Sequence, residues 1–363
     1  MPRSIPDQIL VYILLILSSA PALHVHGNLN CTTIAWRSVP AVFAFGDSIV
    51  DSGNNDAIVT FTKCNFPPYG QDFADRRPTG RFSNGRIPPD FIASLVCVKD
   101  LIPAYLGTDL KSDDLLTGVS FGSGGTGYDP LTPVLVSVLS MSKQLDLFAE
   151  YKERLKEIAG PDTAASIVVE SLYLVCAGSN DILNNYYLGL IRRLQYDISS
   201  YADFLIQQIS DFVHRLYQHG ARKIAIVGLP PLGCLPLQRA LFGGPKRDCE
   251  ASRNRAALLF NSMLEKYIFR LQAELKCQTI GYVDIYDILL DIITSPQNFG
   301  FEEATKGCCG TGHFEVSFLC NSITASTCVD DTKFVFWDSV HPTQQSYKII
   351  VDYVFPRYIQ ILL

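Results

Sequence analysis

Short apolar runs alternate with amphipathic stretches along most of the chain, and this alternation constrains the fold more than any other feature. Each run is too short for a buried helix and ends close to Gly, Pro, Ser or Asn, which indicates a buried strand. The runs are residues 42–45, 118–121, 172–177, 223–228 and 279–285. Helical periodicity marks residues 142–159, 199–220 and 249–275, with a short helix near Asp90. Ser199 or Ser200 is the expected N-cap of the second of these helices. Strands alternating with helices predict a parallel sheet covered on both faces, a doubly wound α/β fold.

The first apolar run ends in Gly46-Asp47-Ser48. Glycine lets the backbone turn sharply there and presents Ser48 beyond the end of the strand. A serine so placed can act as a nucleophile if a histidine takes its proton. Taken alone, the tripeptide is more typical of an ordinary turn, in which Asp and Ser bond their own backbone. The rest of the chain has to decide between the two interpretations.

Two further turns are expected at the same edge of the sheet as Ser48. The glycine-rich residues 122–127 follow the second run, and Gly178-Ser179-Asn180-Asp181 follows the third. Ligands of doubly wound folds bind beyond the carboxyl ends of the strands. We therefore expect the backbone N–H groups of Ser48 and Gly124 and the side-chain amide of Asn180 to stabilise an oxyanion. The alternatives are that Asn180 only forms a turn and that Gly124 only belongs to a flexible loop.

Six histidines are available to take the proton of Ser48, and His341 is the expected one. His341 follows Asp338 by three residues, so Asp338 can accept a hydrogen bond from Nδ1 and leave Nε2 as the base. The D-x-x-H pattern alone is more often a turn. Combined with an exposed Ser48, it predicts a catalytic triad of Ser48, His341 and Asp338. The other histidines lie near the N-terminus, on a polar helix or in a cysteine-rich loop: His24, His26, His214, His219 and His313.

The N-terminus has the pattern of a secretory leader. Arg3 precedes the apolar residues 9–17 and a small-residue stretch, so we expect residues 1–22 to be removed and the protein to be secreted and extracellular. A membrane anchor is the alternative, but the run is shorter than the ~20 residues that a span needs. No internal repeat or linker divides the remainder of the 363 residues, so residues 23–363 are expected to form a single domain.

Charge excludes two classes of partner. The formal net charge is −6 and the sequence has no basic cluster. Nucleic acids and anionic membranes select basic surfaces, so we expect neither as a partner. Stable membrane insertion is not expected either, because no later segment is long enough to span.

The chain has eleven cysteines, an odd number. In an oxidising compartment most should be bridged and at least one left free. Cys176 is the expected free thiol because it lies inside an apolar run. We expect Cys234 to pair with Cys249 and staple the start of the long helix. A later cluster could be a metal site, but its spacing is poor for tetrahedral ligands and favours disulfides; it consists of Cys308, Cys309, His313, Cys320 and Cys328.

Taken together and in this order, the blocks GDSIVDSGNN, GVSFGSGGTG, GSND and DSVH resemble the GDSL-type SGNH hydrolases. The blocks FPPYG, RPTGRFSNGR, GLPPLGCLP, GCCGTG and FWDSVHPT are similar to its plant branch, which includes extracellular lipases. The resemblance implies a three-layer α/β/α sandwich with a parallel, flavodoxin-like five-stranded sheet, no cofactor and no metal. It assigns the nucleophile to Ser48, the acid and base to Asp338 and His341, and the oxyanion hole to Ser48, Gly124 and Asn180. Gly122 stands where many relatives carry Ala.

The predicted function is that of a secreted serine esterase or lipase that works through an acyl-enzyme. Its expected partner is an ester substrate, either a lipid or an acylated cell-wall or surface component. Two alternatives stay open: an extracellular acyltransferase with the same triad, and a non-catalytic protein that binds lipid or glycan. The sequence leaves open the acyl chain, the alcohol, the oligomeric state, and glycosylation at the single sequon, Asn30-Cys31-Thr32.

Overall fold

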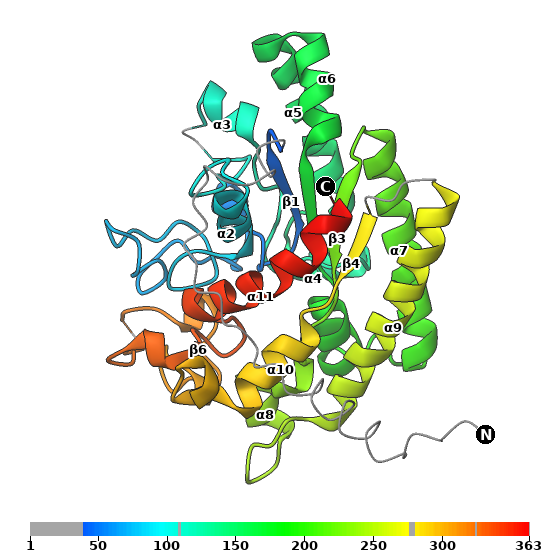
Figure 1. Ribbon diagram of the computed structural model, residues 1–363. Helices are drawn as coiled ribbons and strands as arrows, with labels where there is room; N and C mark the ends of the chain where they lie inside the picture. Colours follow the sequence, from blue (N-terminus) through cyan, green and yellow to red (C-terminus); the bar gives the residue numbers. More distant parts are fainter. Residues whose placement is uncertain (1–38, 108–109, 276–279, 324, 363) are drawn as a thin grey trace, which may run out of the picture. The chain divides into compact units, whose positions relative to one another are not determined.

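The computed structural model describes residues 39–107, 110–275, 280–323 and 325–362, which belong to one compact unit, Ala35–Leu363. The expected leader and the sequon at Asn30 lie outside the described residues. At the centre is a parallel sheet in the order β1-β2-β3-β4 (Figure 1). Its strands are β1 (Val42–Gly46), β2 (Leu172–Cys176), β3 (Lys223–Val227) and β4 (Ile280–Val283). The predicted α/β class is confirmed.

The expected fifth strand, residues 118–121, forms only a bridge. Ser120 pairs in parallel with Ala44 of β1, and the Phe121 N–H donates to the Ala44 carbonyl at 2.8 Å. Gly118 precedes this bridge with φ of 96° and the glycine-rich turn follows it, so few residues are left to extend a ladder. The sheet has four strands where five were expected. With the bridge at its outer edge, the order is that of a flavodoxin-like sheet.

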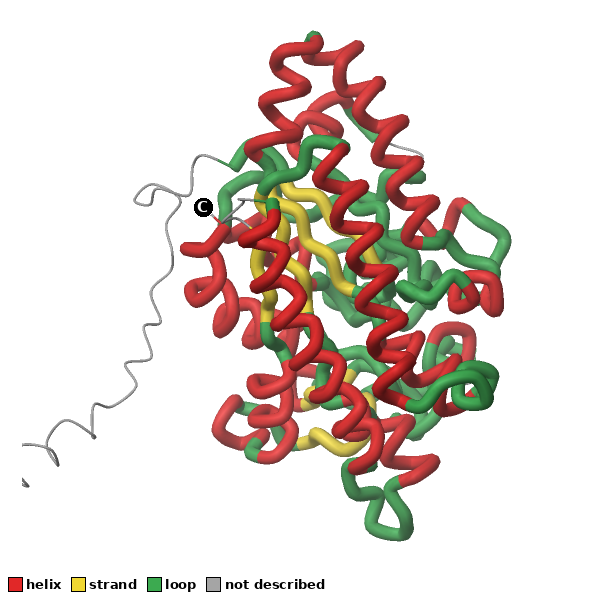
Figure 2. Tube along the Cα trace, turned by 90° about the vertical axis from the view of Figure 1, so that its right-hand side faces the viewer, coloured by secondary structure: helices red, strands yellow, loops and turns green. Residues whose placement is uncertain are grey.

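Helices cover both faces of the sheet. α2 (Pro88–Leu95) and α11 (Gln344–Leu362) pack on one face, where α2 contacts β1 and α11 contacts β3 and β4. α5 (Met141–Ala159) and α9 (Ala251–Glu274) contact β1 and β4 and are joined through α7 (Ile198–Gln218). Figure 2 shows helices in front of the strands on this second side. Almost every strand residue is therefore buried, as the uninterrupted apolar runs predict.

The remaining helices connect these layers. They are α3 (Ser112–Thr117), α4 (Leu131–Val136), α6 (Pro161–Glu170), α8 (Pro236–Phe242) and α10 (Tyr286–Thr294). A π-helix, η3 (Asp181–Leu188), follows β2 directly after Asn180. Nowhere in the described ranges is a helix both long and apolar enough to cross a membrane.

The N-terminus of α7 differs from the prediction. The helix was expected to begin at a cap formed by Ser199 or Ser200, which lie inside its first turn. The cap is Asp197, whose carboxylate accepts the Ser200 N–H at 2.8 Å. An aspartate satisfies this free N–H as well as a serine does, so the cap lies two residues before the earlier of the two serines.

The cysteine predictions are confirmed where the described residues test them. Cys234 pairs with Cys249 immediately before α9, and Cys176 is free and buried. Cys64 is a second free, buried cysteine that the sequence did not single out. The cluster forms the disulfides Cys308–Cys328 and Cys309–Cys320. These disulfides lie in the chain segment that connects the two strands of a small parallel sheet, β5 (Glu303–Gly307) and β6 (Phe334–Phe336).

Candidate active site

Ser48 lies two residues beyond the end of β1, in a turn that depends on glycine. Gly46 has φ of 135°, and a Cβ on it would lie 1.8 Å from the Cys176 carbonyl oxygen of β2. Only a glycine lets β1 approach β2 so closely and then turn away. The turn brings Ser48 Oγ to 2.8 Å from His341 Nε2, a contact between residues 293 positions apart.

The carboxylate of Asp338 is fully buried and is held by its own loop. Its Oδ1 accepts the backbone N–H groups of Val340 and His341 at 2.8 and 2.7 Å. His341 Nδ1 lies 2.8 Å from Oδ2 and 3.0 Å from Oδ1. A proton on Nδ1 is therefore donated to Asp338, which leaves Nε2 free to accept the Ser48 hydroxyl proton. The structure brings together the three residues expected to form the triad.

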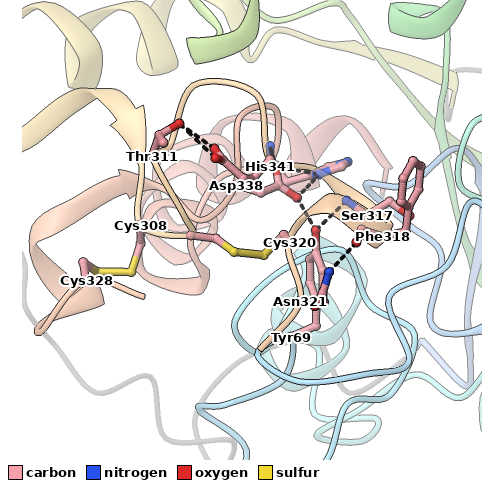
Figure 3. Close-up of a disulfide and its surroundings, with 12 residues drawn as sticks. Tyr69, Cys308, Thr311, Ser317, Phe318, Cys320, Asn321, Cys328, Asp338 and His341 are labelled. Atoms are coloured by element: carbon pink, nitrogen blue, oxygen red, sulfur yellow. Dashed lines mark hydrogen bonds and ion pairs between the residues drawn. A yellow bond between two sulfur atoms is a disulfide. The ribbon is translucent and has the colours of Figure 1, made fainter. Parts of the chain in front are cut away.

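Tyr69 is a member of the site that sequence reasoning missed. Its hydroxyl donates to Asp338 Oδ2 at 2.8 Å and accepts the Ser317 N–H at 2.8 Å (Figure 3). Burial and the Asp338 charge raise the pKa of Tyr69 well above its usual value, so the hydroxyl stays protonated and donates. Ser317 lies inside the loop closed by the Cys309–Cys320 disulfide. The only sequence signal was the FPPYG block, which gave the tyrosine no role.

Asn180 lies at the start of the π-helix, with its amide oriented by neighbours. Its Nδ2 donates to the Thr126 carbonyl at 2.9 Å, and its Oδ1 accepts from Asn184 Nδ2 at 3.2 Å. An amide nitrogen carries two hydrogens, so one N–H remains for a ligand. The Ser48 N–H has no acceptor among the described residues. Both residues line the same cavity.

Gly124 and Gly125 differ in what their N–H groups can do. The Gly124 N–H already donates to Asp51 Oδ2 at 2.8 Å, and a Cβ on this buried glycine would lie 2.3 Å from the Phe82 ring. Gly125, with φ of 91°, lines the cavity, and its N–H has no acceptor in the described part of the chain. The Gly124 N–H, which was expected to bind the oxyanion, is therefore already bonded to Asp51, whereas the Gly125 N–H lies at the cavity without an acceptor among the described residues.

Buried carboxyl groups tie the turns at this edge together. Asp51 Oδ1 accepts the N–H groups of Gly53 and Asn54 at 2.8 and 2.7 Å, in addition to the Gly124 bond. Asp181 accepts the Tyr128 N–H at 2.8 Å and so links the end of the glycine-rich turn to the π-helix. Burial raises the pKa values of both carboxyls, and of Asp47 beside Ser48, to about 7.

A cavity of about 820 Å³ opens at Ser48 and His341. This volume lies within the roughly 300–1,000 Å³ of small-molecule sites. Its walls are mainly apolar and come from the carboxyl ends of β2, β3 and β4, from α11, and from residues 59–62, 135–137 and 316–319. Within the described ranges, no three His, Cys, Asp or Glu side chains are grouped so that they could hold a metal ion.

Comparison with known proteins places the chain in a family. The sequence model described as GDSL-like Lipase/Acylhydrolase matches residues 42–354. The chain is 50% identical over 311 residues to GDSL esterase/lipase At1g20120 of Arabidopsis thaliana, covering 86% of this chain and 77% of that protein. It is also 50% identical over 321 residues to GDSL esterase/lipase EXL3 of the same plant, covering 88% of each.

Among solved structures, Axe2, an acetylxylan esterase from Geobacillus stearothermophilus, aligns with 13% identity and a TM-score of 0.36, covering 89% of this chain and 94% of that one. The extent of the family match and the identity to the plant relatives decide the assignment. The chain belongs to the GDSL-like lipase/acylhydrolase family and is a carboxylic ester hydrolase.

Proposed function

We propose that this protein is a secreted serine esterase or lipase whose triad is Ser48, His341 and Asp338. The observation that carries the proposal is the continuous chain of short contacts from Ser48 Oγ through the imidazole to a buried carboxylate. Ser48 Oγ attacks the ester carbonyl while His341 Nε2 takes its proton, and the imidazolium then gives that proton to the departing alcohol. A water molecule, deprotonated by the same nitrogen, then attacks the acyl carbonyl. The imidazolium returns that proton to Ser48 Oγ as the acid leaves.

The oxyanion is stabilised by three donors that converge on the carbonyl oxygen. We assign these to the Ser48 N–H, the remaining Asn180 amide N–H and, in place of the expected Gly124, the Gly125 N–H. We choose Gly125 rather than Gly124 because the Gly124 N–H is bonded to Asp51 and because Gly125 lies in the cavity wall. Donors aimed at the developing charge in a water-poor site are worth about 10²–10³ in rate each.

Tyr69 acts as a positioning residue. It does not touch the substrate cavity, but its hydroxyl fixes the side of Asp338 that faces away from the backbone donors. A carboxylate held from both sides keeps the imidazole in the orientation that reaches Ser48.

Secretion is supported by the redox state of the cysteines. The described residues contain the disulfides Cys234–Cys249, Cys308–Cys328 and Cys309–Cys320. Such bonds persist in oxidising compartments and are rare in the cytosol. We therefore retain the proposal that residues 1–22 are a removed leader and that residues 23–363 form one domain.

Active-site labelling tests the proposal. A fluorophosphonate should label the native protein at Ser48 and fail to label Ser48→Ala. Ser179→Ala is the matched control, because Ser179 lines the same cavity without a histidine partner and its loss should leave labelling intact. A folded native protein that resists the reagent would favour the non-catalytic alternative. Product analysis with an added alcohol separates hydrolysis from acyl transfer.

A further inference from the structure

The cavity has two parts that differ in exposure. Its rim includes Val59 and Phe61, whose residues are 96% and 89% exposed. Its inner part, here called the inner arm, runs between one face of the sheet and α11 and is lined by residues 5–8% exposed. These are Leu174, Cys176, Val227, Val283, Ile350 and Val354. The rim is open to solvent, whereas the inner arm is enclosed by apolar side chains.

Given the proposed esterase function, this difference indicates which part of the cavity holds the acyl half of the ester and which part holds the alcohol half. The alcohol leaves after the first step, while the acyl group stays attached to Ser48 until water releases it. An enclosed apolar arm suits the part that stays, and the open rim suits the part that leaves. The inner arm is therefore the site of the acyl chain.

Two polar side chains interrupt the apolar wall. The residues Gln238 and Tyr347 are 2% and 3% exposed, and neither Gln238 Oε1 nor Tyr347 Oη has a hydrogen-bond partner among the described residues. Other buried polar atoms of the described chain also lack partners, but only these two belong to residues that line the cavity. A buried polar atom without a partner is costly, so a group from outside the chain should pair with each.

The secondary structure directs Tyr347 toward the inner arm, whereas Gln238 lines the cavity next to the triad loop. Tyr347, Ile350, Val351 and Val354 lie at positions i, i+3, i+4 and i+7 of α11 and share its cavity-facing side. Burial and the charges of Asp338 and Asp47 raise the pKa of Tyr347 well above its usual value, so its hydroxyl remains a donor. Gln238 lies on α8 beside Leu237, whose N–H donates to the Ser339 carbonyl at 2.9 Å. That bond anchors α8 to the loop that carries the triad acid and base.

We propose that the inner arm binds an acyl chain that carries a hydroxyl group, so that the substrate is an ester of a hydroxylated hydrocarbon acid. A hydroxyl both donates and accepts, so it can donate to Gln238 Oε1 or accept from Tyr347 Oη. A plain hydrocarbon chain fills the apolar part of the arm equally well but leaves both polar atoms unpaired. The protein then prefers hydroxylated substrates, because a plain chain leaves Gln238 Oε1 and Tyr347 Oη without hydrogen-bond partners.

The test compares kcat/KM for pairs of nitrophenyl esters that differ only in one acyl hydroxyl, moved along chains of equal length. The wild-type protein should prefer the best hydroxylated ester by roughly tenfold or more, as expected for one hydrogen bond. In Tyr347→Phe and Gln238→Leu this ratio should fall toward one. The ratio does not depend on the amount of folded enzyme. Tyr353→Phe, a half-exposed tyrosine of α11 outside the cavity, should keep the wild-type ratio.

Two results would overturn the inference. A wild-type ratio near one at every hydroxyl position would mean that water satisfies both polar atoms. A preference that follows a hydroxyl on the alcohol half, measured with a second ester series, would reverse the assignment of the inner arm. Failure of the proposed function is a different outcome, because it appears as loss of Ser48 labelling and of all turnover.

Discussion

The nucleophile and the base are held by two different kinds of structure. Ser48 and the proposed oxyanion donors lie in turns at the end of a parallel sheet, tied together by buried carboxyls such as Asp51. Asp338 and His341 lie beyond β6, next to the disulfide-closed segment that follows β5, and Tyr69 supports Asp338. Buried carboxyls with raised pKa values order the first region, whereas the second also has disulfides, which do not titrate. The two regions should therefore respond to different perturbations.

The largest effect is expected where the regions meet. Asp338→Asn keeps the shape of the side chain but favours the wrong imidazole tautomer, so kcat should fall about 10⁴-fold. Steady-state kinetics measure the loss, and a thermal melt checks that the variant is folded. A folded Asp338→Asn protein with nearly full turnover would mean that Asp338 does not orient the base.

The carboxyls of the first region make its stability depend on pH. Burial raises the pKa of Asp47 from 3.8 to about 7. The folded chain therefore keeps a proton that the unfolded chain loses, and the unfolding free energy should fall as pH rises from about 4 to about 7. For one carboxyl the change is at most about 4 kcal/mol. Below pH 4 both states are protonated and the effect is absent.

Asp47→Asn tests this dependence with little other change. The amide oxygen can still accept the Ile49 N–H, which Asp47 Oδ1 now accepts at 3.1 Å. The variant should lose less stability than the wild type between pH 4 and 7, as measured by denaturant unfolding at several pH values. Asp100→Asn, at an exposed carboxylate, serves as the control and should follow the wild-type curve. Parallel curves for Asp47→Asn and wild type would contradict the prediction.

Asn180→Ala separates catalysis from turn formation within the first region. Loss of an oxyanion donor should lower kcat roughly 10²–10³-fold and leave KM nearly unchanged, because the ground-state carbonyl carries little charge. A residue that only forms the turn would instead lower the melting temperature and keep kcat per folded molecule. Kinetics and a melting curve on one preparation distinguish these results.

The two regions also differ in how far the sequence predicts them. The ends of successive parallel strands meet at one edge, so Ser48 and Asn180 could be placed together from apolar runs alone. The choice between Gly124 and Gly125 could not be made, because in a run of glycines the backbone angles decide where each N–H points. The missing fifth strand has the same cause.

The hydrogen bond by which Tyr69 supports the triad could not be predicted from the sequence, for a different reason. The Tyr69–Asp338 hydrogen bond joins residues 269 positions apart, and Tyr69 lies in a loop with no periodic pattern. The Asp338–His341 pair could be predicted because its D-x-x-H spacing is local. A contact between two irregular segments has no characteristic spacing in the sequence. Disulfide pairing within the cluster was equally open, because four cysteines allow several connectivities.

Tyr69→Phe gives the smallest effect and the sharpest view of the second region. Removing a hydrogen bond to a charged group costs about 1.5–3 kcal/mol, so kcat should fall roughly 10–100-fold if Tyr69 positions Asp338. Tyr151→Phe is the matched control, because this buried hydroxyl donates to the Leu115 carbonyl at 2.6 Å and has no link to the site. Its loss should lower stability and leave kcat intact.

The double variant decides whether Tyr69 acts through Asp338. Once Asp338→Asn has removed the carboxylate, Tyr69→Phe should lower kcat little further, because residues that act on one another are not additive. If instead the two losses multiplied, Tyr69 would influence turnover by another route, such as the Ser317 N–H that it accepts. In that case the disulfide-closed loop, rather than the carboxylate, would be the part of the second region that Tyr69 holds in place.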